Sequence, residues 1–201
     1  MNTIEQYHPS INPQHCLQVV KDEGAILLQK FIDKPMQDAI TTEVSQQELT
    51  NLDKSTHAIA EQFDYVAWDS ADETPGAIAQ LGNRIQKLVT ASVPEWRINS
   101  IRAQLYSPGQ VGIDWHRDYE RDLRVIAVAS FLSSSLFEVR LNSQEHQWQL
   151  QPGDVVLMRG MHLNGRRDER PQHKIHAPSA GQRLSVTYRQ FVDTAPKSEQ
   201  K

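Results

Sequence analysis

Cysteine is almost absent from this sequence of 201 residues, since Cys16 is the only one. A single thiol cannot form an internal disulfide, and it excludes the thiolate-rich sites that bind zinc or iron–sulfur clusters. Any bound metal must therefore be held by His, Asp or Glu side chains. Residues 1–10 also lack the cationic start and apolar run of a secretory signal, so we expect a reducing, cytoplasmic environment.

Long apolar runs are absent as well. No segment approaches the roughly 18 consecutive apolar residues that a membrane-spanning helix requires, so we expect no membrane association. The length suits one domain with an ordinary hydrophobic core. We expect a loosely ordered N-terminal segment over residues 1–20, a single domain over residues 21–192 and a polar tail over residues 193–201. No feature indicates an obligate protein partner, and we expect a monomer.

Basic residues are few in the first half of the chain. Residues 1–96 contain 6 basic and 14 acidic residues, a net charge of −8, whereas residues 97–192 contain 13 and 9, a net charge of +4. The overall charge of −4 therefore does not exclude a basic face on the second half that binds nucleic acid. An ordinary solvated surface explains the charge distribution equally well.

The first half of the sequence predicts helices, and the second half predicts strands. Apolar residues at helical spacing follow Pro35 and recur over residues 77–89, so both segments are predicted to be helical, while residues 50–76 are ambiguous. Eight short strands are predicted over residues 98–106, 113–116, 125–131, 136–141, 147–150, 154–158, 172–175 and 183–191. This order predicts an α+β, mainly β fold, in which helices pack on one side of a sandwich or barrel.

A His-x-Asp pair, His116 and Asp118, lies in one of the predicted strands. Alternate side chains share a face of a strand, so both can reach one metal ion, although a surface His beside an acid is as common. A third ligand could be His162, His173 or His176. His173 is favoured, because its short extended segment can pair beside the final strand. Two His and one carboxylate form the facial triad of non-haem Fe(II) oxygenases.

The last predicted strand alternates polar and apolar residues, with Arg183, Ser185, Thr187 and Arg189 on one face. A buried arginine that points into a barrel is costly unless it meets an anion. Two guanidinium groups and two hydroxyls on one face suit a dicarboxylate such as a 2-oxo acid that also binds the metal. If this face looked at solvent instead, the segment would be an ordinary amphipathic edge strand.

Taken in order, these segments resemble the AlkB family of Fe(II)/2-oxoglutarate dioxygenases. The resemblance covers roughly residues 80–192 and rests on the segments 113–118 (IDWHRD), 128–131 (VASF), 137–140 (FEVR), 152–160 (PGDVVLMRG), 172–175 (QHKI) and 183–189 (RLSVTYR). It implies a double-stranded β-helix (jelly-roll) core, with Fe(II), 2-oxoglutarate and dioxygen as metal and co-substrates. The implied activity is oxidative demethylation of N-alkylated bases, of the 1-methyladenine or 3-methylcytosine type, in DNA or RNA.

The resemblance also implies roles for individual residues. His116, Asp118 and His173 would bind the iron, and Arg183 and Tyr106 would bind the distal carboxylate of 2-oxoglutarate. The other residues implied for the co-substrate site are Gln104, Ser185, Thr187 and Arg189, of which Arg189 lies near the metal end. Gln104 and Ser185 both stand where the family usually has Asn.

On the substrate side, Glu120 matches an acidic position near the substrate pocket, and Tyr119 stands where base-repairing members often have an acid. Arg166, Arg167 and Arg170 lie in an insertion that could contact the phosphates of single-stranded nucleic acid, or could be a solvated loop.

Three functions are compatible with this pattern. The first is demethylation of alkylated nucleic acid, as a repair activity. The second is the same oxidation of a protein side chain or small molecule, and the third is a ligand-binding β-barrel without turnover. Phe63, Tyr65 and Trp68 could stack on a base, although such a cluster also suits the core.

Overall fold

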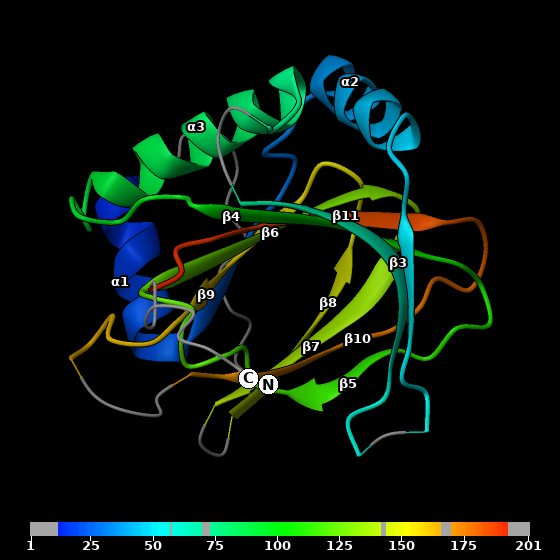
Figure 1. Cartoon of the computed structure of the whole chain (residues 1–201). Helices are drawn as coiled ribbons and strands as arrows, with labels where there is room; N and C mark the ends of the chain where they lie inside the picture. Colours follow the sequence, from blue (N-terminus) through cyan, green and yellow to red (C-terminus); the bar gives the residue numbers. More distant parts are fainter. Residues whose placement is uncertain (1–11, 57, 70–72, 142–143, 166–169, 193–201) are drawn as a thin grey trace, which may run out of the picture.

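The computed structural model describes residues 12–56, 58–69, 73–141, 144–165 and 170–192. Within these residues the chain forms the helices α1 (Pro13–Glu23), α2 (Lys34–Ser45) and α3 (Gly76–Thr90), and eleven strands (Figure 1). The strands are β1 (Ala25–Leu28), β2 (Thr50–Asp53), β3 (Glu61–Trp68), β4 (Ser100–Tyr106), β5 (Gly112–His116), β6 (Val125–Leu132), β7 (Ser135–Leu141), β8 (Gln144–Leu150), β9 (Val155–Arg159), β10 (Gln172–Ile175) and β11 (Arg183–Arg189). None of the described helices is long and apolar enough to cross a bilayer.

The strands form one continuous path that folds into a nearly closed barrel. Their order is β1-β9-β6-β11-β4-β3-β5-β10-β7-β8, with β2 paired to β3, and every ladder between the named strands is antiparallel. Along this path, one wall, the first wall, consists of β1, β9, β6, β11, β4 and β3. The facing wall consists of β5, β10, β7 and β8. In Figure 1 the helices α2 and α3 lie across the outside of the first wall, over β4 and β11. The predicted mainly β jelly-roll fold with helices on one side is confirmed.

Two hydrophobic cores stabilise this arrangement. The larger core lies between the helices and the outer face of the first wall, and the smaller one fills the barrel. The helix α3 buries Ile78, Leu81 and Ile85 at steps of three and four residues, which is the spacing that predicted it. Its first turn is capped from α2, because the carboxylate of Glu43 accepts the backbone N–H groups of Ala77 and Ile78.

The N-terminal segment differs from its prediction. Residues 1–20 are expected to be loosely ordered, yet residues 13–20 belong to α1, which packs against the sheet (Figure 1). Asn12 caps this helix by accepting the N–H of Gln14, and Cys16, Leu17 and Val20 are buried. Tertiary packing of this apolar face stabilises the helix. Residues 1–11 and the predicted tail, residues 193–201, lie outside the described residues.

The ambiguous segment between α2 and α3 contains β2 and β3. β3 pairs with both β4 and β5, and therefore joins the two walls of the barrel. All eight predicted strands are present, with ends that differ by up to three residues.

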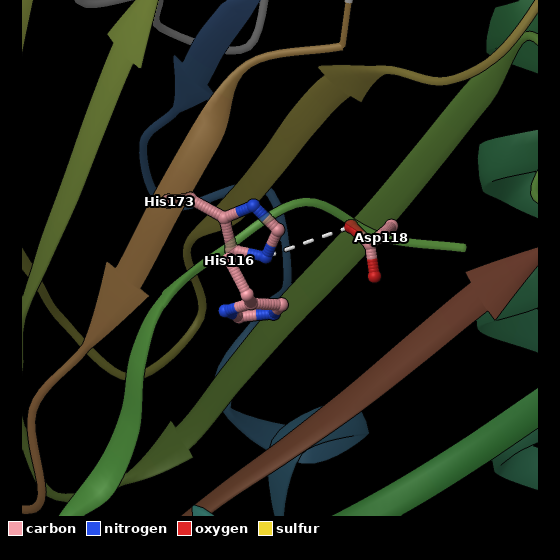
Figure 2. A group of neighbouring side chains, drawn as sticks. All are labelled: His116, Asp118 and His173. Atoms are coloured by element: carbon pink, nitrogen blue, oxygen red, sulfur yellow. Dashed lines mark ion pairs between the residues drawn. The ribbon is translucent and has the colours of Figure 1, made fainter. Parts of the chain in front are cut away.

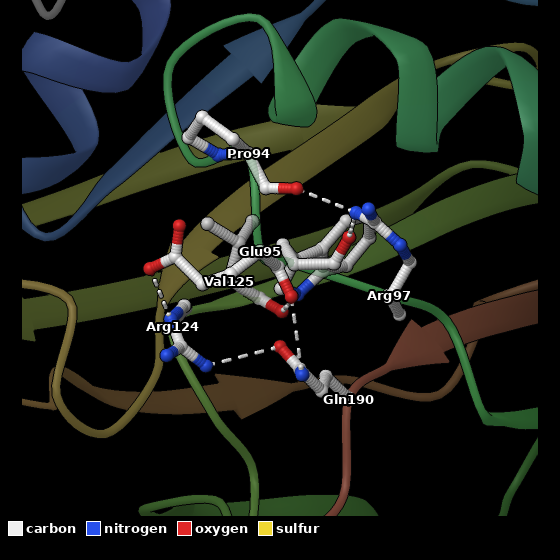
Figure 3. A network of polar contacts seen from close by, with 7 residues as sticks. Pro94, Glu95, Arg97, Arg124, Val125 and Gln190 are labelled. Atoms are coloured by element: carbon white, nitrogen blue, oxygen red, sulfur yellow. Dashed lines mark hydrogen bonds and ion pairs between the residues drawn. The ribbon is translucent and has the colours of Figure 1, made fainter.

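A polar network at the end of β11 fixes the barrel rim (Figure 3). The indole N–H of the buried Trp96 donates to the carbonyl of Val125, the first residue of β6. Arg124 binds the Glu95 carboxylate and also donates to the side chain of Gln190, which follows β11. These contacts hold the start of β6 and the end of β11 against the loop that follows α3.

Candidate metal and co-substrate site

His116, Asp118 and His173 converge at one end of the barrel. His116 ends β5 and pairs directly with His173 on the adjacent β10, while Asp118 follows two residues after His116. His173 Nε2 lies 3.5 Å from Asp118 Oδ2, the contact drawn in Figure 2, and the two imidazole centroids are 4.1 Å apart. One ligand atom from each of the three residues lies within 4.8 Å of the others, so the group could hold one metal ion.

Hydrogen bonding leaves the ligand nitrogen of His116 free. Its Nδ1 lies 2.7 Å from the carbonyl oxygen of Asp114. A carbonyl can only accept, so Nδ1 carries the proton and Nε2 keeps its lone pair. This is the usual way in which a second contact orients a metal-binding histidine.

The electrostatics of the group also suit a metal ligand set. Burial lowers the pKa of His173 to about 3, with a further contribution from His116, so His173 is neutral at neutral pH and its lone pair is available. Burial alone would raise the pKa of Asp118, but the charges of neighbouring groups, among them Arg189, lower it overall, so Asp118 is a carboxylate at neutral pH. Arg189 Nη2 lies 3.2 Å from Asp118 Oδ1.

The other two candidate histidines lie elsewhere. His176 Nε2 is 2.5 Å from Glu138 Oε1, and this pair belongs to neither the cavity nor the triad. His162 is exposed in the loop after β9. Only His173 among the three therefore lies close enough to His116 and Asp118 to complete the set.

A buried arginine lies at the opposite end of the site. Arg183 is 1% exposed, and its guanidinium carbon is 5.2 Å from the centroid of the Tyr106 ring. Its Nη2 donates to the Ser130 hydroxyl, whereas its buried Nε has no hydrogen-bond partner and the guanidinium no carboxylate partner within the described residues. Burial lowers the pKa of Arg183, which measures the cost of an unpaired charge here. An anion bound beside it would remove that cost.

One cavity of about 390 Å³, including its open mouth, joins the two ends. It is lined by all nine residues predicted for the metal and the co-substrate: Gln104, Tyr106, His116, Asp118, His173, Arg183, Ser185, Thr187 and Arg189. Its other walls are apolar side chains of the smaller core. Two imidazoles, one carboxylate and an unpaired guanidinium donor fit Fe(II) and a dicarboxylate, because three protein ligands leave coordination positions for the co-substrate.

The predicted substrate residues are dispersed. Tyr119 is 56% exposed and Glu120 is also exposed, beside the cavity and not in its wall. Arg166 and Arg167 lie outside the described residues. Arg170 is 8% exposed, and its Nη1 donates to the carbonyl of Asp118. Arg170 is therefore not placed for the expected phosphate contact. It is buried, and it supports the backbone of Asp118.

Two residues near the site, Asp122 and Arg102, escape sequence reasoning, whereas Tyr65 is one of the aromatic residues that it offers for base stacking. Asp122 is fully buried and accepts the N–H of Tyr119 at 2.9 Å, and burial raises its pKa to about 6. Arg102 and Tyr65 lie on neighbouring strands beside the metal end. Arg102 could have been found from the alternation along residues 100–106, because it shares a face with Gln104 and Tyr106.

A double-stranded β-helix with two histidines and a carboxylate at one end of its cavity, and a buried arginine at the other, defines the class of non-haem Fe(II) enzymes that use a 2-oxo acid. The sequence model of the 2OG-Fe(II) oxygenase superfamily matches residues 6–189, and the chain belongs to this family. The predicted dioxygenase class, with Fe(II), 2-oxoglutarate and dioxygen, is thereby confirmed. A ligand-binding barrel outside this enzyme class is not supported.

Solved structures share the fold at low sequence identity. A Pseudomonas putida prolyl-4-hydroxylase superposes with a TM-score of 0.69 at 16% identity, covering 90% of this chain and 99% of that one. A Burkholderia pseudomallei oxidoreductase of the 2OG-Fe(II) oxygenase family gives a TM-score of 0.68 at 13% identity, covering 94% and 95%. No curated protein sequence matches the chain significantly.

Proposed function

We propose that the chain is an AlkB-type dioxygenase that demethylates N-alkylated bases, of the 1-methyladenine or 3-methylcytosine type, in single-stranded DNA or RNA. The observation that carries this proposal is the gathering of all nine residues implied by the AlkB resemblance around one cavity. The His-x-Asp segment continues directly into Tyr119 and Arg121, which are exposed beside that cavity.

In this proposal, His116 and His173 would hold Fe(II) through Nε2, and Asp118 would hold it through a carboxylate oxygen. Arg189 donates to Oδ1 of Asp118 and so fixes the rotation of the carboxylate. Phe137 stacks on His173 with ring centroids 5.7 Å apart, and excludes water from that side of the imidazole. Arg170 holds the Asp118 backbone, so the ligand set is positioned before the metal binds.

The co-substrate would lie along the cavity, with its distal carboxylate on Arg183 and the Tyr106 hydroxyl. Gln104, Ser185 and Thr187 offer further hydrogen bonds from the wall between the two ends. The chemistry that bound Fe(II) supplies is activation of dioxygen toward a C–H bond. In the net reaction one oxygen atom enters the methyl group and the other enters succinate, which forms with carbon dioxide from 2-oxoglutarate. The N-hydroxymethyl product then releases formaldehyde and the unmodified base.

The test is formaldehyde release from a single-stranded oligonucleotide that contains one 1-methyladenine, in the presence of Fe(II), 2-oxoglutarate and dioxygen. We expect one formaldehyde and one succinate for each base repaired, and no formaldehyde from the unmethylated oligonucleotide. The measurement is made at low salt, where electrostatic attraction is strongest. Absence of formaldehyde under these conditions, with iron bound and 2-oxoglutarate slowly consumed, would exclude this substrate class.

The same oxidation of a protein side chain or small molecule is the second candidate. It is favoured by Tyr119, which is exposed at a position where base-repairing members often have an acid, and by the acidic first half of the chain. Oxygen incorporation into a peptide or a free nucleoside, without formaldehyde release from oligonucleotides, would support it.

A further inference from the structure

Arg102 lies on the cavity side of β4, at the metal end. The side chain of Arg102 faces inward, because Gln104 and Tyr106, at alternate positions on the same strand, both line the cavity. Across the β4–β11 ladder Arg102 pairs with Thr187, another lining residue. Arg102 itself does not line the cavity, and its ladder partner Thr187 lies two residues before Arg189 on β11.

The charge of Arg102 has no acidic partner within the described residues. Its guanidinium is half-buried and lies 5.1 Å from the centroid of the Tyr65 ring, on the adjacent strand β3. Burial lowers the pKa of Arg102, and the positive charges of Arg189 and Arg121 lower it further. A partly desolvated cation that is surrounded by other cations is unfavourable unless a ligand supplies the anion.

A second pair of the same kind lies beside it. Arg121 stacks on Tyr119 at 5.1 Å and on Phe191 at 4.4 Å, and it too lacks a carboxylate partner in the part of the chain that the structure describes. The carbonyl of Arg121 accepts the N–H of Val192, just beyond the end of β11, and Arg102 pairs with Thr187 on the same strand, so both pairs lie toward the metal end of the cavity. Each pair presents a guanidinium next to an aromatic ring.

We propose that Arg102, supported by Tyr65, binds a phosphodiester of a single-stranded nucleic acid next to the base that enters the cavity. This inference rests on the proposed function. The deep arginine, Arg183, is the one suited to the co-substrate carboxylate, so the charge at the rim is left for the substrate. Each pair offers a guanidinium to a phosphate and a ring to a base, the two groups that repeat along a single strand.

The decisive variant is Arg102→Gln, compared with Arg84→Gln. Arg84 is a matched control, because it also stacks on an aromatic ring, Phe31 at 4.3 Å, but from the exposed face of α3 and far from the cavity. Binding of an unmethylated single-stranded oligonucleotide to the Fe(II)-loaded protein is measured by fluorescence anisotropy without oxygen over a series of salt concentrations. Kinetic constants are measured with the methylated oligonucleotide.

For Arg102→Gln we expect a several-fold higher Kd at low salt, and a log–log salt slope that is smaller by about 0.7. The KM for the oligonucleotide should rise while the KM for 2-oxoglutarate stays close to that of Arg84→Gln. Equal Kd and slope in the two variants would overturn the inference, as would a rise confined to the KM for 2-oxoglutarate. If Arg102→Gln is poorly folded, Arg102→Lys decides: it should keep the salt slope yet raise the Kd, and an unchanged Kd would overturn the inference.

The failure of the inference is distinguishable from the failure of the proposed function. Formaldehyde release by the unaltered protein tests the proposed demethylation. The difference in Kd and salt slope between Arg102→Gln and Arg84→Gln tests the phosphate site at Arg102. Arg102-dependent binding without formaldehyde release would support the rim site and contradict demethylation. Absence of oligonucleotide binding in the unaltered protein would overturn both, and an acidic peptide would then be the anion to test.

Discussion

Replacing Arg183 by Met separates two effects of its buried charge. Without co-substrate the guanidinium is 1% exposed, and its Nε has no partner within the described residues. Desolvation of such a cation costs several kcal/mol, whereas Met fills a similar volume without a charge. We therefore expect the free energy of unfolding of the co-substrate-free variant to equal that of the unaltered protein within about 1 kcal/mol, or to exceed it. Most substitutions of a fully buried side chain cost about 1–3 kcal/mol instead.

The stability of the co-substrate-free protein should be nearly unchanged in Arg183→Met, but its stabilisation by 2-oxoglutarate should decrease strongly. At a hundredfold excess over its Kd, a ligand raises the free energy of unfolding by about 2.7 kcal/mol. A charge-assisted hydrogen bond contributes about 1.5–3 kcal/mol, and a bidentate pair has two of them, so loss of Arg183 should raise the Kd at least about a hundredfold. The same 2-oxoglutarate concentration would then stabilise Arg183→Met by only about 0.4 kcal/mol.

The assay is urea unfolding of the Fe(II)-loaded protein without oxygen, with and without 2-oxoglutarate. Arg84→Met is the control, since Arg84 is exposed on α3 and its variant should keep the full stabilisation by 2-oxoglutarate. Two results would refute the reasoning. One is undiminished stabilisation of Arg183→Met by 2-oxoglutarate, and the other is a loss of more than about 3 kcal/mol in its absence.

Three further predictions concern the metal end. His173→Ala should lose Fe(II) binding in a metal titration whereas His176→Ala keeps it, because His176 is paired with Glu138 outside the cavity; the reverse result would contradict the assignment. Burial raises the pKa of Asp122 to about 6 from 3.8, so its ionisation opposes folding and its own contribution to stability is lost as pH rises from about 4 to 6. The difference in unfolding free energy between the unaltered protein and Asp122→Asn should therefore change by up to about 3 kcal/mol across this range, measured by urea unfolding in EDTA, and a difference that is independent of pH would count against it. Arg170→Met should weaken Fe(II) binding about 10- to 100-fold in the same titration, since it removes a contact to the ligand backbone, and unchanged affinity would argue for a purely structural role.

Most of the candidate site could be predicted from the sequence, because strands impose a strict alternation. Once residues 183–189 are a strand, Arg183, Ser185, Thr187 and Arg189 must share a face, and the cavity lies on that face. The choice of His173 over His176 rests on the expectation that its segment pairs beside the final strand, and that expectation is wrong. β10 pairs with β5 and β7 instead, and its pairing with β5 places His173 beside His116.

The remaining features depend on contacts between distant segments. The helix α1 carries local signals that could have predicted it, namely Asn12 at its start, Pro13 in its first turn and Gly24 after its end, but its packing against β9 is a contact with a distant segment. Arg170 follows an insertion without a period, so neither its burial nor its contact with Asp118 could be foreseen. The contact of Arg102 with Tyr65 likewise depends on the pairing of β3 with β4, although Tyr65 itself is among the residues that the sequence offers for base stacking.

The position of β11 between β6 and β4 has a consequence for folding. This strand is the last of the described strands along the chain, yet it lies in the middle of the helix-covered wall and supplies four of the nine predicted site residues. On the ribosome, β4 and β6 must wait for it with unpaired edges, and its contact with β4 spans about 80 residues of sequence. Such long-range pairing is slow, and waiting edges are prone to wrong partners. The carboxylate end of the cavity, which contains Arg183, is therefore completed only when this strand is inserted, whereas His116 and His173 of the metal end already pair on β5 and β10.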